Sequence, residues 1–278
     1  MKKKIINILM IIFILIALGS GGYLAYYYYT SHKSESNIDD LKGMIRESSV
    51  NTTDTSADSD NGDGLANTSG KSEPMMVDVG GVKIQKKFEA LYRENHDFVG
   101  WIKIDDTNVD YPVMYTPNDN ERGEHYIHRD FEENYSAAGL PFIDKNCALI
   151  LPTDNIIIYG HNMNSGKMFH DILKYENADF YNTHKRFIFD TIYSDGVYEV
   201  VAMFYGQILP DDSNEFKYYK FVNAGNSEEF NEYIDNIKRM SIIDTGVDVK
   251  FGDKLVTLST CAYNVADGRF AVVAKKVE

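Results

Sequence analysis

The sequence predicts a mainly β domain over residues 77–278, built as an antiparallel barrel or sandwich. Short runs rich in β-branched and aromatic residues alternate with turn residues, at irregular spacing and mostly without helical crossovers. About eight of these runs are expected to be strands: 98–104, 109–114, 139–143, 155–160, 186–191, 197–206, 254–260 and 269–276.

Three helical segments are expected around these strands. The first covers 85–95, where Phe88, Leu91 and Tyr92 share one face. The second lies in the insert 166–183. The third covers 227–240, with Ser227 at its capped start, and its apolar residues recur at helical spacing. This spacing predicts that the third helix packs one face on the domain.

The N-terminal residues 1–29 predict a membrane anchor. Lys2 to Lys4 precede the run 5–29, which has no charged residue. Since roughly 20 helical residues cross the hydrocarbon layer, this run is long enough to span a membrane. The lysines predict a cytoplasmic N-terminus, and Tyr26 to Tyr29 suit the opposite interface, so the domain is expected outside the cell. The alternative is a signal peptide cleaved near residues 17–19.

Residues 30–76 are expected to form a flexible polar linker. Its central part, 51–72, consists almost entirely of Asn, Thr, Asp, Ser and Gly, which bury too little apolar surface to offset their ordering entropy. Ile38, Leu41 and Ile45 are spaced as on a short helix. The formal net charge of −14 argues against a nucleic-acid partner.

Two predicted strands end in reactive side chains. His161 follows the strand 155–160, and Cys261 follows the strand 254–260. An imidazole within hydrogen-bond reach of a thiol supports its ionisation and can protonate a departing amine. Arg269 begins the next strand, so a turn would bring its guanidinium beside the sulfur, where a cation stabilises a developing oxyanion. These residues predict acyl transfer through a thioester.

The same segments resemble the sortases, the cysteine transpeptidases that attach proteins to Gram-positive cell walls. The resemblance rests on TLSTC at 257–261, Arg269 at the start of the next strand, and YGHNM at 159–163. The helix before the first strand, NVDYPVM at 108–114 and the long helix before the Cys-bearing strand are similar to class B members. The resemblance covers about residues 80–278 and implies a closed eight-stranded β-barrel with an N-terminal helix and a long inserted helix.

The resemblance also implies roles for individual residues. Cys261 would be the nucleophile, His161 the acid and base, and Arg269 the cation that orients substrate or stabilises the oxyanion. The residues expected to line the groove for the substrate are Asn120, Ile127 and Ser259. Some class B members carry an acidic residue two positions after the cysteine, but this position is Tyr263 here. The sequence therefore predicts a Cys–His dyad with an arginine.

The implied substrates are surface proteins with a C-terminal sorting signal of Asn-Pro-x-Thr type, which is cut after its Thr. The implied acceptor is an amine of peptidoglycan or of its lipid-linked precursor. No metal or organic cofactor is indicated.

Other interpretations of the same residues remain open at this point. Cys147 is expected to be buried and inert, but a disulfide with Cys261 would make both structural. His170 is a second candidate base, and the pair His125 and His128 has the spacing of two zinc ligands without a third. The domain could also be a tethered binding module, or a peptidase that hydrolyses the thioester instead of transferring its acyl group.

Overall fold

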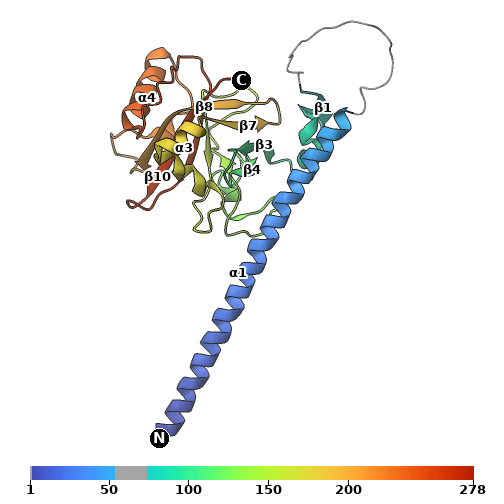
Figure 1. Ribbon diagram of the computed structural model, residues 1–278, viewed down its shortest axis with the longest axis vertical. Helices are drawn as coiled ribbons and strands as arrows, with labels where there is room; N and C mark the ends of the chain where they lie inside the picture. Colours follow the sequence, from blue (N-terminus) through green and yellow to red (C-terminus); the bar gives the residue numbers. More distant parts are fainter. Residues whose placement is uncertain (1, 54–73) are drawn as a thin grey trace.

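The structure, a computed structural model, describes residues 2–53 and 74–278 (Figure 1). Eight strands form a closed barrel in the order β10-β8-β7-β3-β4-β5-β6-β9. Their bounds are β3 Phe98–Lys103, β4 Asp110–Met114, β5 Phe142–Ile143, β6 Asn155–Tyr159, β7 Arg186–Thr191, β8 Val197–Gln207, β9 Leu255–Cys261 and β10 Gly268–Lys276. All eight predicted strands are thus present and the barrel is confirmed. The hairpin of β1 Met76–Val79 and β2 Val82–Gln85 was not predicted.

The barrel is mixed, so the expectation of a purely antiparallel sheet is wrong. β4 pairs with β5 in parallel, and β6 pairs with β9 in parallel. Parallel neighbours need a long connection, and the chain between β6 and β9 contains two further strands and several helical segments. A parallel pair brings the carboxyl ends of both strands to the same edge. This edge carries the segments that the sequence analysis singled out.

The strand β9 is buried on both faces, which explains its nearly continuous run of apolar and small side chains. One face lies inside the barrel. The other face contributes Leu255 to a second apolar cluster, which also contains the buried Phe230 and Ile237 of α4 (Ser227–Met240). The predicted bounds of α4 are confirmed, but its cap is Asn226 and not Ser227, because the Asn226 side chain accepts from the Glu229 amide.

The two other predicted helical segments are present, but each consists of a 3-10 helix followed by a short α-helix. η2 (Lys86–Phe88) and α2 (Glu89–Glu94) form the expected segment before β3. The insert 166–183 contains a 3-10 helix, η4 (Phe169–Glu176), and a short α-helix, α3 (Ala178–Thr183). Two shorter 3-10 helices are η3 (His125–His128) and η5 (Tyr218–Lys220). η4 packs on β8, β9 and β10, and therefore supports the strand that carries the cysteine.

The N-terminal helix α1 (Lys2–Thr53) extends away from the barrel (Figure 1). It continues through residues 30–53, which the sequence analysis assigned to a flexible linker. Ile38 and Leu41 are buried there in the main apolar cluster, and Lys42 pairs with Asp110 of β4 at 3.1 Å. Residues 54–73 of the expected linker lie outside the described residues, and its last residue, Met76, begins β1. Within the part of the chain that the structure describes, no helix has the combined length and apolar character needed to cross a membrane.

Candidate active site

The parallel pair β6–β9 places His161 opposite Cys261. Tyr159 is the register partner of Ser259, so two residues further along each strand come His161 and Cys261. The pairing continues past the end of β6, because the Gly160 amide donates to the Ser259 carbonyl at 3.1 Å. The Thr260 hydroxyl donates to the Gly160 carbonyl at 2.6 Å. The two strand ends are therefore held side by side up to the residues of interest.

The antiparallel pair β9–β10 places Arg269 beside Cys261, because the two residues are direct register partners. Side chains of such partners project from the same face with their Cβ atoms about 5 Å apart. The turn between them closes through the Ala262 amide, which donates to the Gly268 carbonyl at 2.9 Å. The register thus confirms the prediction that the turn places Arg269 beside Cys261.

All three side chains line one cavity of about 270 Å³. Ile127 and Ser259, two of the predicted groove residues, also line it. Further lining residues are Arg122, Gly123, Glu124, Leu140, Phe142, Asp144, Lys145, Tyr159, Gly160, Ile208 and Thr260. The sequence had indicated no role for Arg122 or Lys145, since nothing in their local pattern distinguishes them from surface cations.

The orientation of His161 is set by a backbone carbonyl. Its Nε2 lies 2.9 Å from the carbonyl oxygen of Ile127. A carbonyl oxygen only accepts, so Nε2 carries the proton and Nδ1 is the nitrogen available for proton transfer. The ring also stacks on His128 at a centroid distance of 5.3 Å. Burial lowers the pKa of His161 below the ordinary value of 6.5, which keeps the imidazole neutral at neutral pH.

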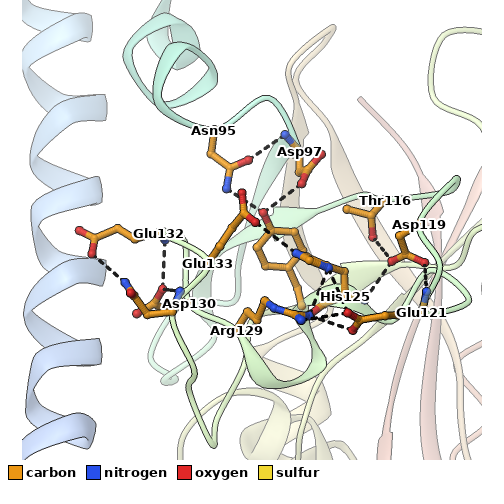
Figure 2. A network of polar contacts seen from close by, with 12 residues as sticks. Asn95, Asp97, Thr116, Asp119, Glu121, His125, Arg129, Asp130, Glu132 and Glu133 are labelled. Carbon is orange, nitrogen blue, oxygen red and sulfur yellow. Dashed lines mark hydrogen bonds and ion pairs between the residues drawn. The ribbon is translucent and has the colours of Figure 1, made fainter.

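A network of polar contacts holds the segment that supplies the Ile127 carbonyl (Figure 2). The Asp119 carboxylate accepts from the amides of Gly123 and His125, at 2.6 and 3.1 Å, which closes the loop before η3. Arg129 donates to both carboxylate oxygens of Glu121 at 2.8 and 2.9 Å, and to the His125 carbonyl at 2.7 Å. These contacts fix η3, and with it the position of Ile127.

The remaining predicted groove residue, Asn120, does not line the cavity. It is exposed in the turn that Asp119 organises. The chain between Asn120 and Ile127 is long enough to place Arg122, Gly123 and Glu124 on the cavity instead. Arg122 adopts a positive φ of 64°, as the tight turn requires. The cavity wall at this loop is therefore formed by residues 122–124 and not by Asn120.

Comparisons with known proteins show the family of this chain. The family model "Sortase domain" matches residues 102–277. The chain belongs to the sortase family. It is 32% identical to sortase B of Staphylococcus aureus over 197 residues, which are 70% of this chain and 76% of that protein.

Solved structures of sortase B have the same fold. A Staphylococcus aureus sortase B–substrate complex superposes with a TM-score of 0.68 at 25% identity, covering 89% of this chain and 98% of that one. Sortase B complexed with triglycine superposes with a TM-score of 0.60 at 31% identity, covering 69% and 86%. The protein is therefore a sortase B-like cysteine transpeptidase, and the interpretation as a binding module without activity is wrong.

Both cysteines of this sortase are free thiols, so the alternative of a bridge between them does not hold. Cys147 is buried, and its Sγ accepts from the Ile157 amide at 3.4 Å. Burial raises its pKa to about 12. Cys147 is thus the inert thiol that the sequence predicted, and Cys261 is the thiol that faces the cavity.

The other histidines take part in packing and polar contacts. His125 lies between Glu121 and Glu133 beside Arg129, at 3.6 and 3.4 Å from the two carboxylates. His128 stacks on His161, as described above. The Nδ1 atom of His170 lies 2.8 Å from the side-chain oxygen of Asn162. Among the described residues, no three side chains of His, Cys, Asp or Glu come together as metal ligands.

Proposed function

We propose that this sortase is anchored in the cell membrane and attaches surface proteins to the cell wall. It would cleave a C-terminal sorting signal of Asn-Pro-x-Thr type after the Thr, through a thioester on Cys261. It would then transfer the acyl group to an amine of peptidoglycan or of its lipid-linked precursor. The observation that supports this proposal best is that Cys261, His161 and Arg269 line one cavity at the common edge of β6, β9 and β10.

In the acylation step, the Cys261 sulfur attacks the Thr carbonyl, and the thiol proton passes to Nδ1 of His161. The carbonyl oxygen becomes an oxyanion, which the guanidinium of Arg269 stabilises. When the tetrahedral intermediate collapses, the C–N bond breaks and the imidazolium donates its proton to the leaving amine. The Nε2–H bond to Ile127 stabilises the transient imidazolium in the way that a carboxylate does in a triad. No carboxylate is then required at Tyr263.

In the transfer step, the acceptor amine attacks the thioester carbonyl and loses a proton to Nδ1 of His161. The C–S bond breaks, and the Cys261 thiolate recovers the proton from the imidazolium. Arg269 again faces the oxyanion. The chemistry needs an uncharged imidazole before each attack, and the low pKa of His161 supplies it.

The proposed substrate and acceptor are supported by what similar proteins bind in their solved structures. One similar sortase B has been solved with a substrate and another with triglycine, a short peptide with a free amine. In this chain Ile127 and Ser259 would contact the sorting signal. Ser259 is buried and hydrogen-bonded to the Tyr218 hydroxyl at 2.8 Å, so it presents a fixed surface to the signal.

The proposed anchor is the run 5–29, which has no charged residue. Its described side chains include exposed Ile, Leu and Phe residues, whose burial in a bilayer would be favourable. The three N-terminal lysines would remain on the cytoplasmic side. The catalytic domain would then lie on the outer face of the membrane.

The test uses a fluorogenic sorting-signal peptide, the full-length protein and triglycine as acceptor. The expected products are the released C-terminal fragment and the N-terminal fragment extended by triglycine. Cys261→Ala is expected to abolish both, and the surface variant Asn164→Ala serves as the control. Wild-type cleavage by Cys261→Ala would refute the proposal. Release of the free acid without any triglycine product would make the enzyme a hydrolase.

A further inference from the structure

The Asn162 side chain helps to link the two catalytic strand ends beyond their last backbone hydrogen bonds. Asn162 directly follows His161, and its Nδ2 lies 2.9 Å from the backbone carbonyl oxygen of Cys261. The β6–β9 ladder has ended at this point, so no backbone pair performs this task. The contact therefore joins the residue after the imidazole to the residue that carries the thiol.

The orientation of the Asn162 amide is determined by its partners. The Cys261 carbonyl only accepts, so the atom that faces it must be the NH₂ group. The amide oxygen of Asn162 then faces Nδ1 of His170 at 2.8 Å, and Nδ1 must carry a proton. The result is a directed chain of two hydrogen bonds, from His170 to Asn162 and from Asn162 to Cys261.

His170 is itself held in a fixed position. It lies in the first turn of η4, which packs on β8, β9 and β10. The Phe169 amide donates to the His161 carbonyl at 2.8 Å, so η4 is tied directly to the catalytic histidine. The preceding residue, Met168, has a positive φ of 55°, and its amide donates to the Tyr111 hydroxyl at 3.1 Å. The surrounding contacts maintain this strained turn, which presents the imidazole of His170 to Asn162.

We propose that Asn162 and His170 are positioning residues of the transpeptidation reaction. Neither contacts the reacting atoms. Together they hold the backbone of Cys261 against the segment of His161, so that sulfur and Nδ1 keep the separation that proton transfer needs. The inference rests on the proposed roles of Cys261 and His161. It also gives His170 a function other than that of the alternative base.

The experiment measures kcat and KM for sorting-signal cleavage in single and double variants of the full-length protein. Asn162→Ala and His170→Ala are each expected to lower kcat roughly tenfold with little change in KM, because they remove alignment and not substrate contacts. The double variant should lose no more than the stronger single variant, since both substitutions interrupt one chain. Asn164→Ala, in the same loop and exposed, is the matched control and should behave as wild type.

A conservative variant separates positioning from general packing. In His170→Asn the amide NH₂ occupies nearly the place of Nδ1 and can donate to Asn162, so most of the lost kcat should return. In Asn162→Asp the shape is kept, but a carboxylate oxygen faces the Cys261 carbonyl, and kcat should fall at least as far as in Asn162→Ala. The thermal midpoint of each variant is measured alongside.

Three results would overturn the inference: wild-type kcat in His170→Ala, additive losses in the double variant, or a His170→Asn variant as impaired as His170→Ala. If Asn162→Ala does not fold, the His170 variants alone decide. Failure of this inference is distinct from failure of the proposed function. Full loss of activity in Cys261→Ala together with wild-type kcat in His170→Ala would refute only the positioning roles.

Discussion

The loop glycine Gly139 offers a test of the contact that orients His161, the proposed acid and base. Its φ is +56°, and a Cβ at this position would lie 2.2 Å from the carbonyl oxygen of Ile127. This is the oxygen that accepts from Nε2 of His161. Gly139→Ala therefore forces either the loop or the Ile127 carbonyl to move. Both movements break the geometry that holds the imidazole.

The expected magnitude has two parts. The left-handed backbone costs about 1 kcal/mol for a residue with a side chain. The steric conflict with the backbone adds about 1–3 kcal/mol, as for overpacked sites. For a domain of this size, a total of about 2–4 kcal/mol lowers the thermal midpoint by roughly 5–15 °C. The displaced carbonyl should also reduce kcat by about tenfold or more at a temperature where the variant is folded.

The matched control is Gly80→Ala in the β1–β2 turn. Gly80 has a similar φ of +63°, but nothing lies within 4 Å of the point where a Cβ would stand, so this variant measures the backbone cost alone. Differential scanning calorimetry and the peptide-cleavage assay are applied to both variants. Equal thermal midpoints for the two variants, or an unchanged kcat in Gly139→Ala, would refute the proposed role of the Ile127 carbonyl.

Four further predictions concern the charged and ionisable groups. Arg269→Ala should lower kcat/KM by about 10²–10³-fold. Arg269→Lys should restore only part of the lost kcat/KM, because lysine lacks the planar fork of arginine. Equal kinetics for Arg269→Ala and wild type would exclude oxyanion stabilisation by Arg269. In the pH profile of kcat/KM, the decrease on the acid side should lie below pH 6.5. Burial lowers the pKa of His161, so its imidazole stays neutral in the free enzyme at pH 6.5. A decrease centred above pH 6.5 would contradict this prediction. The same shift makes stability fall as pH decreases through 6.5, since the unfolded chain then binds more protons than the folded one. A thiol reagent at mildly alkaline pH should label Cys261 and leave Cys147 unmodified, and mass spectrometry showing two labels would contradict the burial of Cys147.

The strands and the long helix could be predicted because their sequence patterns are local. The eight β-rich runs and the apolar spacing of 227–240 have counterparts in the structure within a few residues. The strand order could not be predicted in the same way. Whether β6 lies beside β9 in parallel depends on packing between segments about a hundred residues apart, and no local pattern records it.

The spacing of Ile38, Leu41 and Ile45 indicated only a short helix, whereas the whole of residues 30–53 is helical. The polar composition of the following segment favoured a linker, whereas burial of Ile38 and Leu41 against the domain supports a continuous helix. Tertiary contacts of this kind outweigh the weak intrinsic preference of the segment.

The functional residues also differ in whether a local sequence pattern could predict them. Cys261, His161 and Arg269 could be proposed from the sequence because they stand at strand ends, and a strand end fixes where a side chain is presented. The carbonyl of Ile127 carries no sequence signature, because every residue has one. That Asn120 lies outside the cavity could not be predicted, because the loop 119–125 is closed by Asp119 and a loop conformation does not follow from a motif match. Asn162 and His170 are separated by a turn whose shape depends on Met168.

The central claim is that Cys261 forms the thioester, and trapping the acyl-enzyme tests it most directly. The full-length protein is mixed with a sorting-signal peptide in the absence of an acceptor amine, quenched in acid and digested for tandem mass spectrometry. One acyl group, ending in Thr, is expected on Cys261 and none on Cys147. Peptide cleavage that leaves Cys261 unmodified, or an acyl group carried by another residue, would contradict the claim.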